Sequence, residues 1–119
     1  MVDELLSETV RALSRRSRGA EAGPYLEQLR RVSTGRPNAE AFLWWAEGVA
    51  LGDRSKARAA ADRFAALTRP IDEGRSLLDL ADLGVDPESN RARARELFTE
   101  CGADVYLRQA SPDAATCVG

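Results

Sequence analysis

The stretch from Asn38 to Pro70 constrains the fold most, because two amphipathic helical patterns follow one another there with a break of two residues. Apolar residues recur at steps of three or four in both halves: Phe42, Trp45 and Val49, then Ala57, Ala60, Ala61, Phe64 and Leu67. Gly52 can adopt a positive φ and end the first helix, and Asp53 can cap the free N–H groups that open the second. The stretch therefore predicts an antiparallel helix pair.

The pair recurs along the chain at a spacing of about 34 residues. This shift places Ala60 over Ala94 and Phe64 over Phe98, so small residues meet small ones and large meet large. It also aligns Leu43 with Leu77, Trp44 with Leu78 and Val49 with Leu83. A period of this length is typical of tetratricopeptide repeats, in which helical hairpins stack side by side.

The N-terminal third predicts a less regular hairpin. An opening helix is expected at about residues 2–16, and a second helix is expected to begin at Pro24, after a loop over residues 17–23. The apolar face of the opening helix consists of Leu5, Leu6, Thr9, Val10 and Leu13. Because this pair matches the repeat pattern poorly, we interpret it as an irregular leading repeat.

The C-terminal third predicts a third hairpin. Pro70 starts a fifth helix, a break follows at Gly84 to Pro87, and a sixth helix runs to about Glu100. The inward face of the sixth helix is predicted to hold Ala94, Leu97, Phe98 and Cys101. A short last helix begins at Val105. No segment alternates apolar and polar residues as a strand does.

The predicted fold class is therefore all-α. We expect a single domain over residues 1–110, built as a short solenoid of about three antiparallel hairpins, and a disordered tail over residues 111–119. The 119 residues are 44% hydrophobic and 30% charged, with a formal net charge of −2. No long apolar run and no signal-peptide core are present, so a cytoplasmic protein without a membrane span is expected.

The central residues resemble a general repeat pattern and, more specifically, one group of bacterial proteins. The order Trp44, Gly48, Ala60, Phe64 and Pro70 resembles the tetratricopeptide pattern of Trp, Gly, Ala, Phe and Pro, with Glu47 and Leu51 departing from it. Residues 38–110 further resemble the C-terminal helical repeats of bacterial LuxR-type or MalT-type ATP-dependent regulators and of ATPase-linked nucleotide cyclases. The resemblance implies a helical-repeat fold and a regulatory role. The P-loop of those regulators has no counterpart in this sequence.

Four side chains are candidates for an interaction surface: Trp44, Trp45, Arg91 and Arg95. Adjacent helical residues point about 100° apart, so at most one tryptophan faces a given pocket, and core packing is the alternative role for the pair. The arginines alternate with acidic residues, so a solvated surface of ion pairs is the alternative to a basic face.

No catalytic, cofactor or metal site is predicted. The chain has no histidine, and its two cysteines, Cys101 and Cys117, do not form a CxxC motif. Asp79 and Asp82 share a helical face, but no nucleophile or histidine accompanies them. Cys101 at a helix C-terminus is a poor nucleophile and is expected to pack inward, whereas Cys117 is expected to be exposed.

The leading hypothesis is a non-enzymatic protein–protein interaction module with a regulatory role. It would present the groove between its first helices to a protein or peptide partner, and it could also form a homodimer through an end face or the tryptophan pair. The alternative is a regulator that senses a small molecule, which requires a closed apolar pocket, or one linked to nucleic acid, which requires a continuous arginine face. The near-neutral net charge argues against nucleic acid.

Overall fold

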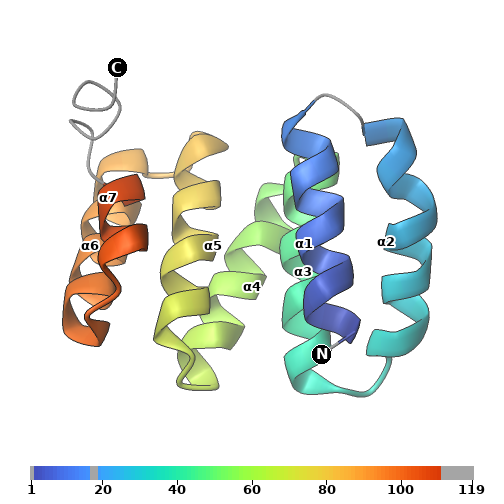
Figure 1. The fold of residues 1–119 in the computed structure, drawn as a ribbon, viewed down its shortest axis with the longest axis horizontal. Helices are drawn as coiled ribbons and strands as arrows, with labels where there is room; N and C mark the ends of the chain where they lie inside the picture. The colour runs from blue at the N-terminus through green and yellow to red at the C-terminus, as the bar shows by residue number, and fades with distance from the viewer. Residues whose placement is uncertain (1, 17–18, 111–119) are drawn as a thin grey trace.

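The computed structural model describes residues 2–16 and 19–110, which form seven helices and no strand (Figure 1). In order, the helices are α1 (Val2–Arg15), α2 (Gly19–Ser33), α3 (Pro37–Leu51), α4 (Arg54–Ala66), α5 (Pro70–Asp82), α6 (Pro87–Cys101) and α7 (Asp104–Ala110). The all-α prediction is confirmed for these residues. The predictions for residues 17–18, for Cys117 and for a tail at 111–119 fall outside the described ranges. In the described part, no helix has the length and apolar character needed to cross a bilayer.

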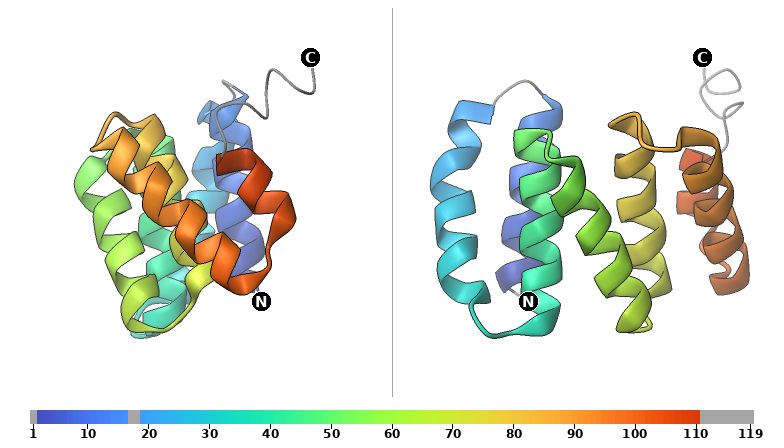
Figure 2. Two further views of the ribbon diagram at one scale, coloured as in Figure 1. Left: turned by 90° about the vertical axis from the view of Figure 1, so that its left-hand side faces the viewer. Right: turned by 180° about the vertical axis from the view of Figure 1, so that it is seen from behind.

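Neighbouring helices in the sequence pack against one another throughout the molecule. The pairs α1–α2, α3–α4 and α5–α6 are in contact, α3 also packs on α1 and α2, and α4 also packs on α5. The short helix α7 packs on α6. Figures 1 and 2 show α1 and α7 on one face of the molecule and α4 on the opposite face.

The predicted turn of the central pair is confirmed in detail. Gly52 ends α3 with a φ of 64°, in the left-handed region that glycine adopts at little cost. Asp53 caps α4, since its Oδ1 accepts a hydrogen bond from the Lys56 N–H at 3.1 Å. The two helices approach closely at Gly48, where an added Cβ would lie 2.8 Å from the Ala57 Cβ. Only glycine fits this crossing.

Two core clusters follow the sequence pattern. Phe42, Trp45 and Phe64 pack in the α3–α4 pair, with the rings of Phe42 and Phe64 5.0 Å apart in an edge-to-face arrangement. The cluster of α5 and α6, to which α4 contributes two alanines, consists of Ala57, Ala61, Leu77, Leu80, Ala94, Leu97 and Phe98. The predicted inward positions Ala94, Leu97 and Phe98 are confirmed.

The predicted start of α2 at Pro24 is wrong, because the helix already begins at Gly19. Proline inside a helix removes the hydrogen bond to the carbonyl four residues earlier, and its ring crowds the preceding residue. Here the cost is limited, since Pro24 follows Gly23, which has no Cβ, and lies about one turn beyond the first four N–H groups of the helix, which have no partner within the helix. Burial of Ala22 against Leu6 and Val10 favours the longer helix.

Two predicted buried positions are also wrong. Leu5 is 67% exposed, and α1 instead buries Asp3, Leu6, Ser7, Val10 and Arg11. Its buried face is rotated toward polar residues because α1 packs on α2 on one side and on α3 on the other. Cys101 is exposed, since it is the last residue of α6 and lies about one turn beyond the buried Leu97 and Phe98.

Candidate functional site

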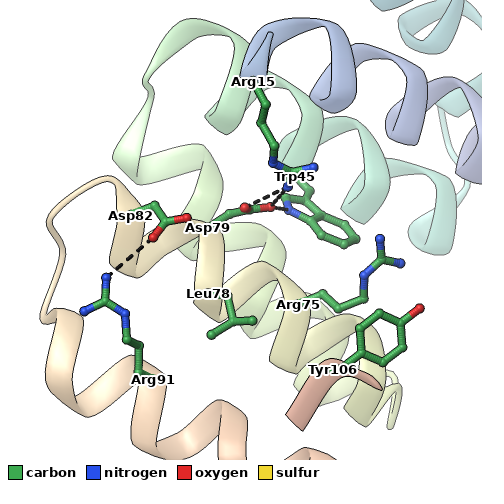
Figure 3. Close-up of a pocket in the computed structure, with 8 residues that line it drawn as sticks. All are labelled: Arg15, Trp45, Arg75, Leu78, Asp79, Asp82, Arg91 and Tyr106. Carbon is green, nitrogen blue, oxygen red and sulfur yellow. Dashed lines mark hydrogen bonds and ion pairs between the residues drawn. The ribbon is translucent and has the colours of Figure 1, made fainter. Parts of the chain in front are cut away.

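A pocket of about 370 Å³ opens on the face that carries α1 and α7 (Figure 3). Its lining residues are Arg15 of α1, Trp45 of α3, Arg75, Leu78, Asp79 and Asp82 of α5, Arg91 of α6 and Tyr106 of α7. The four residues of α5 follow one another at steps of three, one and three, which places them on one face of the helix. The pocket is therefore the exposed face of α5, enclosed by side chains from four other helices.

Trp45 is the fixed wall of the pocket. Its side chain is 1% exposed and packs on Phe42 and Phe64, with ring centroids 6.2 and 5.7 Å away. Its indole Nε1–H donates a hydrogen bond to Asp79 Oδ2 at 2.7 Å. Because a buried indole N–H needs an acceptor, this bond holds the ring in one orientation and joins α3 to α5.

Asp79 of α5 accepts hydrogen bonds from side chains of two other helices, α1 and α3. Besides the bond from Trp45, its two carboxylate oxygens accept hydrogen bonds from Arg15 Nη2 at 2.7 and 2.6 Å. The carboxylate is largely buried, whereas about half of the Arg15 side chain remains exposed. A charge-assisted pair of this geometry is stronger than a surface ion pair. It links the C-terminal end of α1 to the middle of α5.

Arg11 lies behind the tryptophan and is 1% exposed. Its guanidinium carbon is 3.4 Å from the centroid of the Trp45 ring, so the two planar groups are stacked. Its Nε donates to the carbonyl and the hydroxyl oxygen of Ser7, both at 3.2 Å, and the Ser7 hydroxyl donates to the Phe42 carbonyl at 2.8 Å. Its Nη1 and Nη2 atoms have no acceptor among the described residues.

The charge of Arg11 is retained at neutral pH although its environment opposes it. Burial, and then the positive charge of Arg75, lower the pKa of Arg11 to about 9, and Asp79 offsets part of this change. The guanidinium therefore remains protonated under ordinary conditions, with two buried nitrogens that have no acceptor within the described chain. A buried charge without full hydrogen bonding costs stability.

Arg75 and Arg91 are the loosely paired cations of the pocket. The guanidinium carbon of Arg75 lies 5.3 Å from the Trp45 ring centroid and 5.1 Å from that of Tyr106, and Figure 3 shows it between the two rings. Its ion pair, with the exposed Glu8, is 3.5 Å long. Arg91 makes a contact of the same length with the exposed Asp82. Exposed pairs this long contribute little, so both arginines keep donors for a ligand.

Arg11, Trp45 and Asp79 occupy the same position of successive predicted repeats, and the sequence analysis did not recognise this relation. Trp45 and Asp79 are 34 residues apart, and Arg11 precedes Trp45 by the same interval. Arg11 stacks on Trp45 and Trp45 bonds to Asp79, so equivalent positions of α1, α3 and α5 contact one another in turn. The 34-residue comparison contained this signal. A comparison by hydrophobicity does not reveal it, because Arg, Trp and Asp differ in that property.

The structure brings two of the four candidate interaction residues to the pocket. Trp45 and Arg91 line it, whereas Trp44 and Arg95 are not among its lining residues. Trp44 is partly exposed and carries the Arg63 guanidinium carbon 4.6 Å from its ring centroid. The two tryptophans therefore face different surroundings, as their helical spacing predicts.

The remaining surface arginines are interleaved with acids. Three of these ion pairs are Arg58–Asp62, Arg63–Glu40 and Arg93–Glu96, with nitrogen–oxygen distances of 3.7, 3.6 and 3.1 Å. The hydrogen bond that Arg93 donates to Glu96 raises the pKa of Arg93 above its ordinary value. These pairs match the alternative of a solvated surface that the sequence left open for the arginines.

The site has the groups of a binding pocket. It contains aromatic rings, one leucine and arginines with free donors, and within residues 2–16 and 19–110 no group of three or more Cys, His, Asp or Glu residues is placed to hold a metal ion. No family model, curated protein or solved structure matches the chain. The geometry of the pocket is accordingly the basis for the functional proposal.

Proposed function

We propose that this chain is a non-enzymatic, tetratricopeptide-like interaction module that receives a segment of a partner protein in the pocket of α5. The observation that carries the proposal is the position of the pocket, where the first helices of successive pairs, α1, α3 and α5, present side chains to one space. In stacked helical repeats, surfaces formed by equivalent helices are the ones used for binding.

A repeat architecture is supported by the contacts between equivalent positions. Arg11, Trp45 and Asp79 occupy equivalent positions of three helices, and each contacts the next. The close crossing at Gly48 and Ala57 fits the small residues of the tetratricopeptide pattern. The short-solenoid arrangement and the link to the tails of bacterial ATP-dependent regulators are part of this proposal, and the regulatory role follows from that resemblance.

The chemistry of the pocket suits a protein partner. Trp, Tyr and Arg are the residue types that most often dominate the binding energy of protein interfaces, and this pocket has Trp45, Tyr106 and three arginines around Leu78. Its walls are held by buried contacts, which lowers the ordering cost of binding. A regulator that senses a small molecule is the second candidate, and the same enclosed volume favours it.

Site-directed photocrosslinking in cells tests the proposal. A benzophenone side chain placed at Leu78 lies in the pocket, and one placed at Ala65 lies on an exposed position of α4 and serves as the control. We expect Leu78 to give a discrete adduct with a protein segment and Ala65 to give none, and Arg75→Gln to remove the adduct. Equal labelling from both positions, or a Leu78 probe that labels no protein, would contradict the function.

The same experiment addresses self-association. Val2 and Leu5 are exposed at the N-terminal end of α1, which keeps a homodimer as the specific alternative for the partner. An adduct at Leu78 between two copies of the chain, with a mass that doubles over a concentration series in sedimentation, identifies the partner as a second copy. A constant monomer mass together with a foreign adduct excludes it.

A further inference from the structure

We propose that the pocket binds one carboxylate group, held directly by Arg75, while Arg11 contributes a second fixed positive charge from behind Trp45. The group is expected on a short apolar chain that lies over Leu78. Two sources provide this chemistry: a Glu or Asp side chain of a partner segment, and a free organic acid. Only the first source rests on the proposed function.

The charges around the pocket indicate the charge that a bound ligand should carry. The cations are Arg11, Arg15, Arg75 and Arg91, and the anions are Glu8, Asp79 and Asp82. Four positive charges face three negative ones, so one monovalent anion makes the site neutral. A phosphate monoester carries a charge of about −1.5 to −2 at pH 7 and would overcompensate next to three carboxylates. The balance therefore favours a carboxylate.

The hydrogen-bond donors determine where that anion binds. Asp79 already accepts from Arg15 and from Trp45, so it does not satisfy Arg75. The Arg75 guanidinium is held between the rings of Trp45 and Tyr106 and makes its one described ion pair at 3.5 Å with an exposed acid. A guanidinium presents parallel N–H groups that match the two oxygens of a carboxylate. A carboxylate that binds the remaining Arg75 donors, with Glu8 still in place, fits this position.

The buried positive charge of Arg11 gives the pocket a preference for an anion. Its Nη1 and Nη2 atoms have no hydrogen-bond acceptor within the described chain, and the buried guanidinium is stacked on Trp45 at 3.4 Å. A charge in a dry environment acts over a longer distance than one in water. Arg11 is thus a positioning charge, and Arg75 is the contact residue.

Nuclear magnetic resonance of the tryptophan indole N–H groups provides the test. The Trp45 signal reports on the pocket and the Trp44 signal is an internal control, with Trp45→Phe used for assignment. The first probe is hexanoate, compared with neutral hexanamide at constant ionic strength. The second is the blocked peptide acetyl-Ala-Leu-Glu-Leu-Ala-amide, compared with the same peptide carrying Gln. We expect a saturable shift of the Trp45 signal with the carboxylate of at least one pair and none with its amide.

The variants separate a binding role from a structural one. Arg75→Gln should weaken carboxylate binding by about tenfold or more, since a charge-assisted hydrogen bond is lost. Arg91→Gln, on the rim, should weaken it by about threefold, in line with an exposed charge. Arg31→Gln removes the same charge from an exposed site outside the pocket and should leave binding within about twofold. Arg11→Met should weaken binding although the protein still folds, which a purely structural role does not predict.

The outcomes distinguish this inference from the proposed function. Shifts with both carboxylates support both. A shift with hexanoate and none with the Glu peptide keeps the carboxylate site and removes the protein partner. If each amide shifts the Trp45 signal as far as its acid, or if Arg31→Gln costs as much as Arg75→Gln, the carboxylate site is overturned, whereas crosslinking at Leu78 still decides the protein-interaction function.

Discussion

Helices α1 and α6 bury their inner faces by different means. The buried residues of α6 are three apolar side chains and Asn90, whose amide donates to the Val85 carbonyl at 2.7 Å. The buried face of α1 contains Asp3, Ser7 and Arg11 as well as Leu6 and Val10, and its exposed face carries Val2 and Leu5. The buried face of α1 is thus largely polar, whereas the buried face of α6 is mainly apolar.

The difference shows what an apolar pattern can and cannot specify. In α6 the apolar face meets the apolar face of α5, so burial by itself stabilises the pair. In α1 the inner residues contact Trp45 and the Phe42 carbonyl of α3, where a positive charge is retained at a cost. Under the proposed function, stability and binding would therefore impose opposite requirements on the two ends of the molecule.

The largest effect is expected from the apolar end. Phe98 is 0% exposed and packs on Tyr106 at 5.6 Å, so Phe98→Ala should lower the free energy of unfolding by about 3–5 kcal/mol, from lost burial and the cavity left behind. Urea denaturation followed by circular dichroism measures it. Tyr25→Ala on α2 is the matched control at an exposed site, with an expected change within about 0.5 kcal/mol. Equal losses would remove the distinction between the two ends.

A smaller loss is expected from a helical glycine of the same hairpin. An added Cβ at Gly74 would lie 2.5 Å from a ring carbon of Phe98, which is fully buried and has no room to move. Gly74→Ala should therefore destabilise the protein by about 1–2 kcal/mol, although alanine favours a helix. An added Cβ at Gly23 in α2 has no atom within 4 Å apart from its chain neighbours, but it would crowd Pro24, so Gly23→Ala should give no stabilisation. A stabilising Gly74→Ala, measured by thermal unfolding, would show that the ring yields.

The polar end should respond with the opposite sign. Arg11→Met removes two unpaired buried nitrogens, each worth about 1–3 kcal/mol. It loses a stacking contact worth about 2 kcal/mol and the Nε hydrogen bonds to Ser7, worth about 1 kcal/mol each. We expect a net gain of about 1 kcal/mol in the free energy of unfolding at pH 7. Arg11→Gln, which keeps a polar end, should not reproduce that gain. A loss of 2 kcal/mol or more in Arg11→Met would place Arg11 among the residues that hold the fold.

The smallest change in the free energy of unfolding is expected at Glu73 of α5. This residue lies in the apolar end, and its surroundings disfavour its ionised form. Burial raises the pKa of Glu73 above 4.5, and Asp62 and Glu100 act in the same direction, while Arg93 opposes them. A raised folded-state pKa gives stability that is complete below the unfolded pKa and is lost as pH rises through the folded pKa. The charged form is thus penalised at pH 7.

Glu73→Gln should therefore stabilise at pH 7 by no more than about 0.5 kcal/mol, because solvent screens a partly exposed charge. The gain over wild type should disappear below about pH 4.5, where Glu73 is protonated in both states. Urea midpoints of the two proteins between pH 3.5 and pH 7.5 measure this. Glu88→Gln, in the first turn of α6, is the control. A gain that grows toward acid pH would reverse the assigned cause.

Much of the fold could be predicted because its determinants are local. The Gly52–Asp53 turn, the helix starts at Pro70 and near Pro87, and the inward face of α6 depend on residues within one or two turns of each other. The start of α2 could not be predicted, since burial of Ala22 against α1 outweighs the proline signal. The inner face of α1 was wrong for a similar reason. Its orientation is set by α3, which follows later in the chain.

The site was less predictable than the fold. The sequence identified Trp45 and Arg91 as candidates, but Arg15, Arg75 and Tyr106 reach the pocket from helices far apart in the sequence. Arg75 and Tyr106, for example, are joined only by the ring contact that the packed helices create. An arginine buried by tertiary contacts carries no mark in a composition or a hydropathy pattern.

The role of α4 in the packing has a mechanical consequence. This helix contacts α3 on one side and α5 on the other, so it joins the block of α1, α2 and α3 to the block of α5, α6 and α7. The pocket spans the two blocks, and Asp79 closes it from one block by binding Arg15 and Trp45 of the other. An occupant of the proposed site that touches both blocks would hold them at one angle to each other. Binding and the curvature of the molecule would then be thermodynamically linked.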